Sequence, residues 1–299
     1  FRNRETGMEP FSAAMSPLGA ASRLVDFHGM PAVHWESRDG ATAVATLQGA
    51  QVVSWTPTRG AESLYLSERS AFEPGRPIRG GIPVVFPQFA NRGSLPQHGF
   101  ARTLPWQFTG TRESGETASA TFVLQSSEKT LADWPHPFRL ELVASIGGAR
   151  LDVQLRVRNT GPDAFTFTAA LHTYLRVAEA AKARIEGLRS VRYVDRGSTE
   201  VRVEGREAVD AAEAIDRVYT ATPRVLHMRD EKRLLRIAQR GFYDTVLWNP
   251  GPERTAQMPD MPAEGYRRMF CVEAALLDPP MRLNGGADWS GEQSIVVGA

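Results

Sequence analysis

Apolar and polar residues alternate through the middle of the chain. From Phe138 to Ile146 every second residue is apolar, and the same period returns between Leu151 and Val157. Gly147 and Gly148 stand in the short gap between the two runs. Two alternating runs joined by a short glycine-containing loop predict a β-hairpin with one buried face and one solvated face.

A third run extends from Phe165 to Leu175 and predicts another strand. Successive side chains of a strand point to opposite faces, so the odd positions of this run form an apolar face of phenylalanine, alanine and leucine. The even positions are more polar and include Thr166, Thr168, His172 and Tyr174. We therefore expect His172 beside hydroxyl-bearing side chains.

Short strand-like runs recur along the rest of the chain. They lie at 41–47, 51–55, 119–125, 201–204, 234–238, 245–248, 269–276 and 293–297. Helical turns are expected only at 129–133 and 211–217. Many strands with frequent glycine and proline between them favour an all-β protein built as an antiparallel β-sandwich or barrel. We expect one domain over residues 25–299, preceded by a flexible leader or expression remnant over residues 1–24.

The segment from Arg79 to Arg102, RGGIPVVFPQFANRGSLPQHGFAR, fits no regular element and predicts a structured loop around short strands. Long irregular loops on a rigid scaffold often carry function, although a plain surface excursion fits the pattern equally. The guanidinium groups of Arg79 and Arg102 suit a phosphate or carboxylate, because each can donate two parallel hydrogen bonds. The loop therefore predicts an anion site, provided that the two arginines converge.

Two titratable residues stand out for proton transfer. His172, in LHTYL, could be a structural histidine or a proton donor, since an ordinary histidine titrates near pH 6.5. Glu273 is the only charged residue in MFCVEAALL, and strand parity places it with Cys271 and Ala275. An acid in so apolar a setting is expected to be desolvated, which raises its pKa and makes it a better base near neutrality.

Other chemistry is weakly supported. Asp216 and Asp244 fit turn positions as well as catalytic ones, and no HxH, HExxH or CxxC spacing indicates a metal site. We expect Cys271 to be a buried small residue. Trp55, Trp106 and Trp248 are expected in the core, although one of them could stack on a sugar.

Charge and composition restrict the partners. The 299 residues include 35 Lys and Arg against 34 Asp and Glu, a net charge of +1, so a broad basic surface for nucleic acid is not expected. No apolar stretch reaches the ~18 residues of a membrane span, and the first residues lack the apolar core of a signal peptide. A single cysteine allows no internal disulfide. We expect a cytoplasmic monomer.

Seven motifs, in order, resemble those of the aldose 1-epimerase-like family, in its hexose-6-phosphate mutarotase branch. They are RGGIPVVFPQF, LPQHGFAR, DWPHPF, LHTYL, IDRVY, DTVLWNP and CVEAA, within a likeness that covers about residues 25–297. The chain departs from the family pattern at Ala90, where glycine is common, and at Gly251, where tryptophan is common. The resemblance implies a large antiparallel β-sandwich of the galactose mutarotase-like supersandwich type.

The resemblance also implies roles for individual residues. His172 matches the general acid of the family and Glu273 its general base. Substrate-binding positions match Arg79, Gln97, Arg102 and Asp216, and His98 matches a second histidine that mutarotases of free sugars use. The implied reaction interconverts the α and β anomers of a hexose 6-phosphate, most simply glucose 6-phosphate, with acid and base on opposite sides of C1–O5. No metal or cofactor is implied.

Three alternatives remain at this point. A mutarotase of unphosphorylated aldoses would not need Arg79 and Arg102 to share a pocket. A non-catalytic carbohydrate-binding sandwich would not need His172 and Glu273 near each other. A glycoside hydrolase would pair Glu273 with Asp216 or Asp244 at a separation of ~5–9.5 Å.

Overall fold

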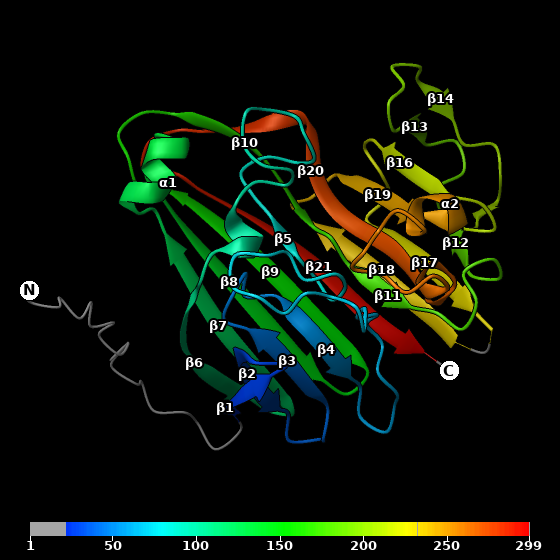
Figure 1. The fold of residues 1–299 in the computed structure, drawn as a ribbon, viewed down its shortest axis with the longest axis horizontal. Helices are drawn as coiled ribbons and strands as arrows, with labels where there is room; N and C mark the ends of the chain where they lie inside the picture. The colour runs from blue at the N-terminus through cyan, green and yellow to red at the C-terminus, as the bar shows by residue number, and fades with distance from the viewer. Residues whose placement is uncertain (1–21, 232, 299) are drawn as a thin grey trace, which may run out of the picture.

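The computed structural model describes residues 22–231 and 233–298, which are mostly antiparallel strands in three sheets (Figure 1). The smallest sheet has four strands in chain order: β1 (Ser22–Phe27), β2 (Met30–Glu36), β3 (Thr42–Thr46) and β4 (Val52–Thr56). It holds buried Trp35 and Trp55 in the same apolar core as the two larger sheets.

The nine-stranded sheet forms one layer of the sandwich. Its order is β15 (Ala208–Val209), β12 (Arg184–Glu186), β17 (Val225–Asp230), β18 (Arg233–Arg240), β21 (Asp288–Gly298), β9 (Arg150–Asn159), β8 (Phe138–Gly147), β7 (Thr117–Gln125) and β6 (Gln107–Ser114). The predicted hairpin is confirmed as β8 and β9, which pair from Phe138↔Asn159 to Gly147↔Arg150. Its apolar positions are buried, as alternation in a one-sided strand requires.

The eight-stranded sheet forms the opposing layer. Its order is β14 (Arg202–Val203), β13 (Arg192–Asp195), β16 (Ile215–Tyr219), β19 (Asp244–Asn249), β20 (Met269–Leu283), β10 (Phe165–Leu171) and β5 (Val84–Val85), and β11 (Tyr174–Arg176) also pairs with β20. Side chains from both layers join one large apolar cluster, with Leu142 and Leu155 from one side and Phe167 and Val272 from the other. The predicted antiparallel β-sandwich is confirmed.

Helices are short and peripheral. They are α1 (Glu128–Asp133), α2 (Gly251–Thr255) and the 3-10 turns η1 (Ala101–Thr103) and η2 (Gly265–Arg268). Ser127 caps α1, because its hydroxyl accepts the Thr130 N–H while the Thr130 hydroxyl accepts the Ser127 N–H. No helix in the described ranges is long and apolar enough to cross a membrane.

The structure corrects three expectations. The turn predicted at 211–217 is not helical, because Ile215 opens β16 and pairs with Asn249 of β19. Residues 22–24, expected in the leader, belong to β1, while residues 1–21 lie outside the described residues. The run 165–175 is not one strand, because β10 stops at Leu171 and β11 starts at Tyr174. The extent of the domain, 25–299, stays a prediction.

Candidate active site

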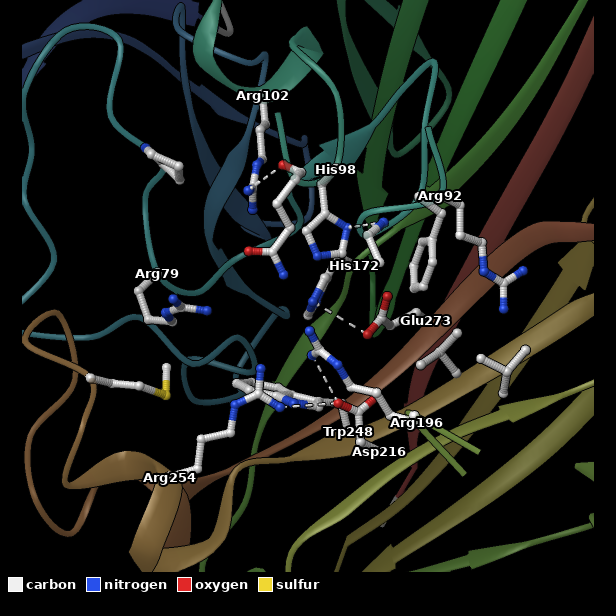
Figure 2. Close-up of a pocket in the computed structure, with 18 of the residues that line it drawn as sticks. Arg79, Arg92, His98, Arg102, His172, Arg196, Asp216, Trp248, Arg254 and Glu273 are labelled. Atoms are coloured by element: carbon white, nitrogen blue, oxygen red, sulfur yellow. Dashed lines mark hydrogen bonds and ion pairs between the residues drawn. The ribbon is translucent and has the colours of Figure 1, made fainter. Parts of the chain in front are cut away.

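The interruption between β10 and β11 places His172 opposite Glu273 of β20. Leu171 pairs with Ala274, and Tyr174 pairs with Cys271, so the register is unchanged across the gap. His172 and Glu273 are therefore cross-strand neighbours, with Nε2 of the imidazole 3.3 Å from Oε1 of the carboxyl group (Figure 2). Side chains directly opposite each other on one face are the closest pairs in a sheet, which explains the contact.

Strand parity directs Glu273 away from the sandwich core, on the face that it shares with Cys271 and Ala275. Its neighbours Val272 and Ala274 pack in the core cluster between the sheets. On the other face, Cys271 belongs to one small apolar cluster and Ala275 to another. Glu273 stands between these clusters with only 1% of its surface exposed, so water cannot solvate its charge.

Burial controls the protonation of the pair. It raises the pKa of Glu273 well above 4.5, and the nearby Asp216 charge adds to the rise. It also lowers the pKa of His172 well below 6.5, assisted by His98 and Arg102. The direction for Glu273 agrees with the sequence prediction, whereas an ordinary titration of His172 near pH 6.5 does not hold. Burial thus favours the neutral form of each group, a protonated carboxyl group and an uncharged imidazole.

Aromatic rings fix the imidazole of His172. Tyr174 stacks parallel to it with ring centroids 4.8 Å apart and planes at 10°. The rings of His98 and Trp248 form T-shaped contacts with it, at centroid distances of 5.5 Å and 5.9 Å. These rings pack around the imidazole, whose Nε2 faces Glu273.

A pocket of about 520 Å³ opens over this pair. Its size is within the usual range for small-molecule sites. All seven site residues singled out from the sequence line it: Arg79, Gln97, His98, Arg102, His172, Asp216 and Glu273. All of them except Gln97 are labelled in Figure 2. Strands β13, β16, β19 and β20 contribute lining residues, His172 enters from the gap between β10 and β11, and the loop 79–102 supplies further residues.

Arg79 is held by two partners that the sequence did not reveal. Its Nε and Nη2 each lie about 3 Å from Oδ2 of Asp260, and its Nη1 donates to the Tyr174 hydroxyl at 3.0 Å. Burial acts to lower the pKa of Arg79, but the contacts with Tyr174 and Asp260 outweigh it, so the net change is upward. Arg79 is therefore a fixed cation whose charge is already matched by a carboxylate.

His98 is positioned by the loop backbone. Its N–H donates to the Ala90 carbonyl at 3.0 Å, and its Nδ1 accepts from the Ala90 N–H at 3.3 Å. Burial, with Arg102 nearby, lowers the pKa of His98 to about 3. A neutral imidazole that accepts at Nδ1 carries its proton on Nε2. His98 is thus a neutral donor at the pocket wall.

Ala90 adopts the left-handed backbone region with φ of 48°, which glycine enters more easily than alanine. This is the position where the family pattern commonly has glycine. The reciprocal bonds between Ala90 and His98 keep the loop closed despite the side chain. Alanine is therefore accommodated at this position by its two backbone hydrogen bonds with His98.

Arg102 differs from Arg79 in having no acidic partner among the described residues. Its Nη2 donates to the Gln97 carbonyl at 2.8 Å, while its Nε is buried without a hydrogen bond in the described part of the chain. Burial lowers the pKa of Arg102 to about 10, and the charge of Arg79 contributes. It still carries its charge at neutral pH and has donors to spare for an anion.

The sequence analysis did not single out four further pocket arginines, which are Arg76, Arg92, Arg196 and Arg254. Arg196 and Arg254 each donate to Oδ2 of Asp216 at 3.1 Å, and both line the pocket. Arg196 follows β13 and Arg254 lies in α2, so only the fold brings them to Asp216 of β16. No spacing in the sequence signals this arrangement.

The three tryptophans singled out from the sequence lie in two places, the core and the pocket. Trp55 and Trp106 are core residues, whereas Trp248 lines the pocket beneath Arg79 and Arg254, whose guanidinium carbons lie 5.9 Å and 5.7 Å from its ring centroid. The alternation of side chains along β19 could have indicated that Trp248 lies on the face that borders the pocket. Cys271 is buried, as expected.

Asp244 does not belong to the site. It is fully buried and accepts backbone N–H groups from Ala221, Leu277 and Asp278. These bonds give it a structural role at the start of β19. Within residues 22–231 and 233–298, no group of three His, Cys, Asp or Glu side chains could hold a metal ion.

Comparisons with known proteins agree with this geometry. A model of the family described as Aldose 1-epimerase matches residues 31–296. A protein of Cenchrus ciliaris named "Putative glucose-6-phosphate 1-epimerase" is 35% identical over 260 residues, which cover 83% of this chain and 79% of the relative. A protein of Escherichia coli K12 with the same name is 36% identical over 235 residues, covering 77% of this chain and 78% of the relative.

Solved structures give the same answer. The crystal structure of a "putative mutarotase" from Salmonella typhimurium matches with a TM-score of 0.87 and 30% identity, covering 95% of each chain. A galactose mutarotase-like protein from Clostridium acetobutylicum shares the fold, with a TM-score of 0.75 at 15% identity, covering 93% of this chain and 98% of the other. The match over nearly the whole chain, with the seven residues in one pocket, places this protein in the aldose 1-epimerase family.

Proposed function

We propose that the protein is a mutarotase that interconverts the α and β anomers of a hexose 6-phosphate, with glucose 6-phosphate as its substrate. The observation that carries this proposal is the buried contact between His172 and Glu273, at 3.3 Å. Two of their atoms, Nδ1 of His172 and Oε2 of Glu273, are buried without a hydrogen-bond partner in the described residues. Buried polar atoms are nearly always paired, so a bound polyol or water is expected to complete them.

The pair suits a reaction that moves two protons around one carbon atom. A proton shift from the Glu273 carboxyl group to Nε2 of His172 turns the neutral pair into a base and an acid. Glu273 then removes the proton of the O1 hydroxyl while His172 protonates the ring oxygen O5, and the C1–O5 bond breaks to give the aldehyde. Rotation about C1–C2 presents the other carbonyl face. Attack by O5 returns one proton to His172, and Glu273 gives the other back to O1.

The placement of the pair corrects one expectation about this mechanism. Acid and base were expected on opposite sides of C1–O5, yet His172 and Glu273 lie side by side on neighbouring strands. O1 and O5 are both bonded to C1, so adjacent groups can reach both oxygens. Positioned acid and base groups each contribute ~10²–10⁴-fold, which suits a reaction that already proceeds in water.

The charges around the pocket favour a phosphorylated sugar. Six arginines and four acidic residues line it. Arg76, Arg79, Arg196 and Arg254 are each paired with a carboxylate, whereas Arg92 and Arg102 form no salt bridge among the described residues. We therefore assign the main phosphate contact to Arg102. Arg79 is assigned a weaker, secondary contact, because its charge is already matched by Asp260.

A glycoside hydrolase is not supported. Asp244 lies outside the pocket, and Asp216 is held by Arg196 and Arg254. A non-catalytic carbohydrate-binding protein would have no use for a desolvated acid in contact with a histidine. The remaining alternative, a mutarotase of unphosphorylated aldoses, differs only in the use of Arg102.

The test compares two substrates. Freshly dissolved α-glucose 6-phosphate and α-glucose are followed by polarimetry or proton NMR, with and without the protein. We expect kcat/KM for the phosphorylated sugar to exceed that for glucose by at least about tenfold, since charge-assisted hydrogen bonds contribute about 1.5–3 kcal/mol. Equal values would favour the free-sugar alternative, and no acceleration of either would favour a binding protein.

The oligomeric state expected from the sequence, a monomer, stays a prediction. Light scattering of the purified protein would test it, with a mass near 32.9 kDa expected. The cytoplasmic location stays a prediction.

A further inference from the structure

The backbone is irregular at the point where the acid–base pair sits. In a regular antiparallel ladder, Thr173 and Val272 would exchange two hydrogen bonds, because they face each other in the register of β10, β11 and β20. Only one of these bonds is present, from the Val272 N–H to the Thr173 carbonyl at 3.1 Å. The Thr173 N–H turns back to the Leu171 carbonyl at 2.9 Å, which deprives the Val272 carbonyl of its strand partner.

Gln293 supplies the missing partner from the opposite layer. It lies in β21 of the nine-stranded sheet, which runs behind β20 (Figure 1), and is 2% exposed. Its Nε2 donates to the Val272 carbonyl at 2.9 Å, and its Oε1 accepts from the Thr173 hydroxyl at 2.5 Å. Both halves of one amide are thus used on the residues that follow His172 and precede Glu273.

We propose that Gln293 is a positioning residue for proton transfer, holding the interrupted strand in the form that sets His172 against Glu273. The inference rests on the proposed function for its catalytic consequence. Without the Gln293 amide, the Val272 carbonyl is unsatisfied in an apolar core, which is unfavourable. The simplest relief is for the Thr173 N–H to turn to Val272, which makes the strand regular and rotates the backbone next to His172.

Burial of a polar side chain in the sandwich core needs a reason of this kind. Gln293 shares its face of β21 with Trp289 and Ile295, which pack in or against the apolar cluster. An apolar residue of similar size would fit that face without any polar requirement. The Gln293 amide instead forms hydrogen bonds with the Val272 carbonyl and the Thr173 hydroxyl at the strand interruption.

Asn159 provides a matched control. It is also a fully buried amide, and its Nδ2 donates to the Leu283 carbonyl of the same strand β20 at 3.0 Å, as well as to Asp163. It is therefore expected to contribute to stability as Gln293 does. Unlike Gln293, it contacts no residue adjacent to His172 or Glu273.

The experiment compares Gln293→Leu with Asn159→Leu. We expect both to lower Tm, because each leaves a buried carbonyl unpaired. Below the unfolding transition, Gln293→Leu should lower kcat about 10–100-fold with KM within about twofold, since a misplacement of about 1 Å at a reacting centre has an effect of this size. Asn159→Leu should keep kcat within about twofold. Equal kcat values for Gln293→Leu and wild type would overturn the proposal.

A spectroscopic readout separates this inference from the proposed activity. The imidazole ¹⁵N shifts of His172, assigned by their loss in His172→Asn, report the tautomer and the contact with Glu273. They should move in Gln293→Leu and stay in place in Asn159→Leu. If the wild type catalysed no anomerisation, the proposed function would fail, while unchanged His172 shifts in Gln293→Leu would reject the positioning role independently.

Thr173→Val gives a milder variant should Gln293→Leu not fold. It removes the hydroxyl that donates to Gln293 and keeps the side-chain shape. We expect a smaller loss of kcat, and the Gln293→Leu/Thr173→Val double variant should lose no more than Gln293→Leu alone, because the two groups act through one bridge. Wild-type kcat and His172 shifts in Thr173→Val would contradict the proposal.

Discussion

His172 and Glu273 face each other directly across neighbouring strands, with the imidazole Nε2 3.3 Å from the carboxyl Oε1. They lie between two apolar clusters, so burial favours the neutral form of each. In the proposed mechanism, transfer of the carboxyl proton to Nε2 of His172 makes the pair a base and an acid. This relationship determines how the protein should respond to substitution and to pH.

Loss of either partner should remove most of the activity without unfolding the protein. We expect Glu273→Gln and His172→Asn each to lower kcat for glucose 6-phosphate by about 10²–10⁴-fold, the usual contribution of a positioned acid or base. Both substitutions keep the side chain polar and close to its original size. Circular dichroism should show native spectra, and full activity in one variant would exclude that residue from the mechanism.

His172 and His98 should remain neutral at pH values where ordinary histidines are charged. Burial is the leading cause for both: it lowers the pKa of His98 to about 3 and the pKa of His172 to well below 6.5. In ¹⁵N NMR of the free protein, we expect neutral imidazole shifts for both residues at pH 6.5. Imidazolium shifts for His172 at that pH would show that Glu273 is ionised beside it.

Glu273→Gln should stabilise the protein at alkaline pH. The pKa of Glu273 is raised in the folded state above its unfolded value of 4.5, so the stability from its protonated form is present below pH 4.5 and is lost as pH rises through the folded pKa. Glutamine never ionises and avoids this loss. We expect Tm of Glu273→Gln to exceed that of the wild type by at least about 2 °C at pH 8.

The difference in Tm should shrink as the pH falls towards 4.5, because the wild-type carboxyl group is then protonated in the folded state and becomes half protonated in the unfolded state. Calorimetry of both proteins between pH 4.5 and pH 8 tests this trend. A constant difference across that range would indicate that packing, and not ionisation, separates the two proteins.

Arg102→Gln should weaken the handling of the phosphate specifically. Arg102 has no carboxylate partner among the described residues, so its charge is available to an anion, whereas Arg79 is paired with Asp260. We expect kcat/KM for glucose 6-phosphate to fall about 10–100-fold, the equivalent of one charge-assisted interaction. Turnover of glucose should change less than about threefold.

Ionic strength supplies a check on the same assignment. The wild-type KM for glucose 6-phosphate should rise between 50 mM and 500 mM salt, because screening weakens attraction to a partly exposed arginine. The KM for glucose should not rise, because glucose carries no charge. Arg76→Gln is the control, since Arg76 lines the pocket but pairs with Glu73 at an exposed position. Equal losses in Arg76→Gln and Arg102→Gln would point to a general charge effect.

The alternation of apolar and polar residues predicted much of the fold. The β8–β9 hairpin followed from period-two alternation, because a strand buried on one face must place its apolar residues at every second position. The same parity separated Glu273, with Cys271 and Ala275, from the core residues Phe270, Val272 and Ala274. The sequence pattern wrongly predicted a helical turn at 211–217, because pairing of β16 with β19 overrides a weak helical propensity. It also did not predict α2, whose five residues carry no periodic signal.

The residue types of the site, their order along the chain and the face of the strand shared by neighbouring residues follow from the amino-acid sequence. Which of these groups meet depends on the folded chain. The contact of His172 with Glu273 depends on strand register, the pairing of Arg79 with Asp260 spans about 180 residues, and Gln293 reaches its partners from another sheet. Hydrogen bonds and charge pairs act over a few ångströms, and distances between residues remote in sequence exist only once the chain has folded.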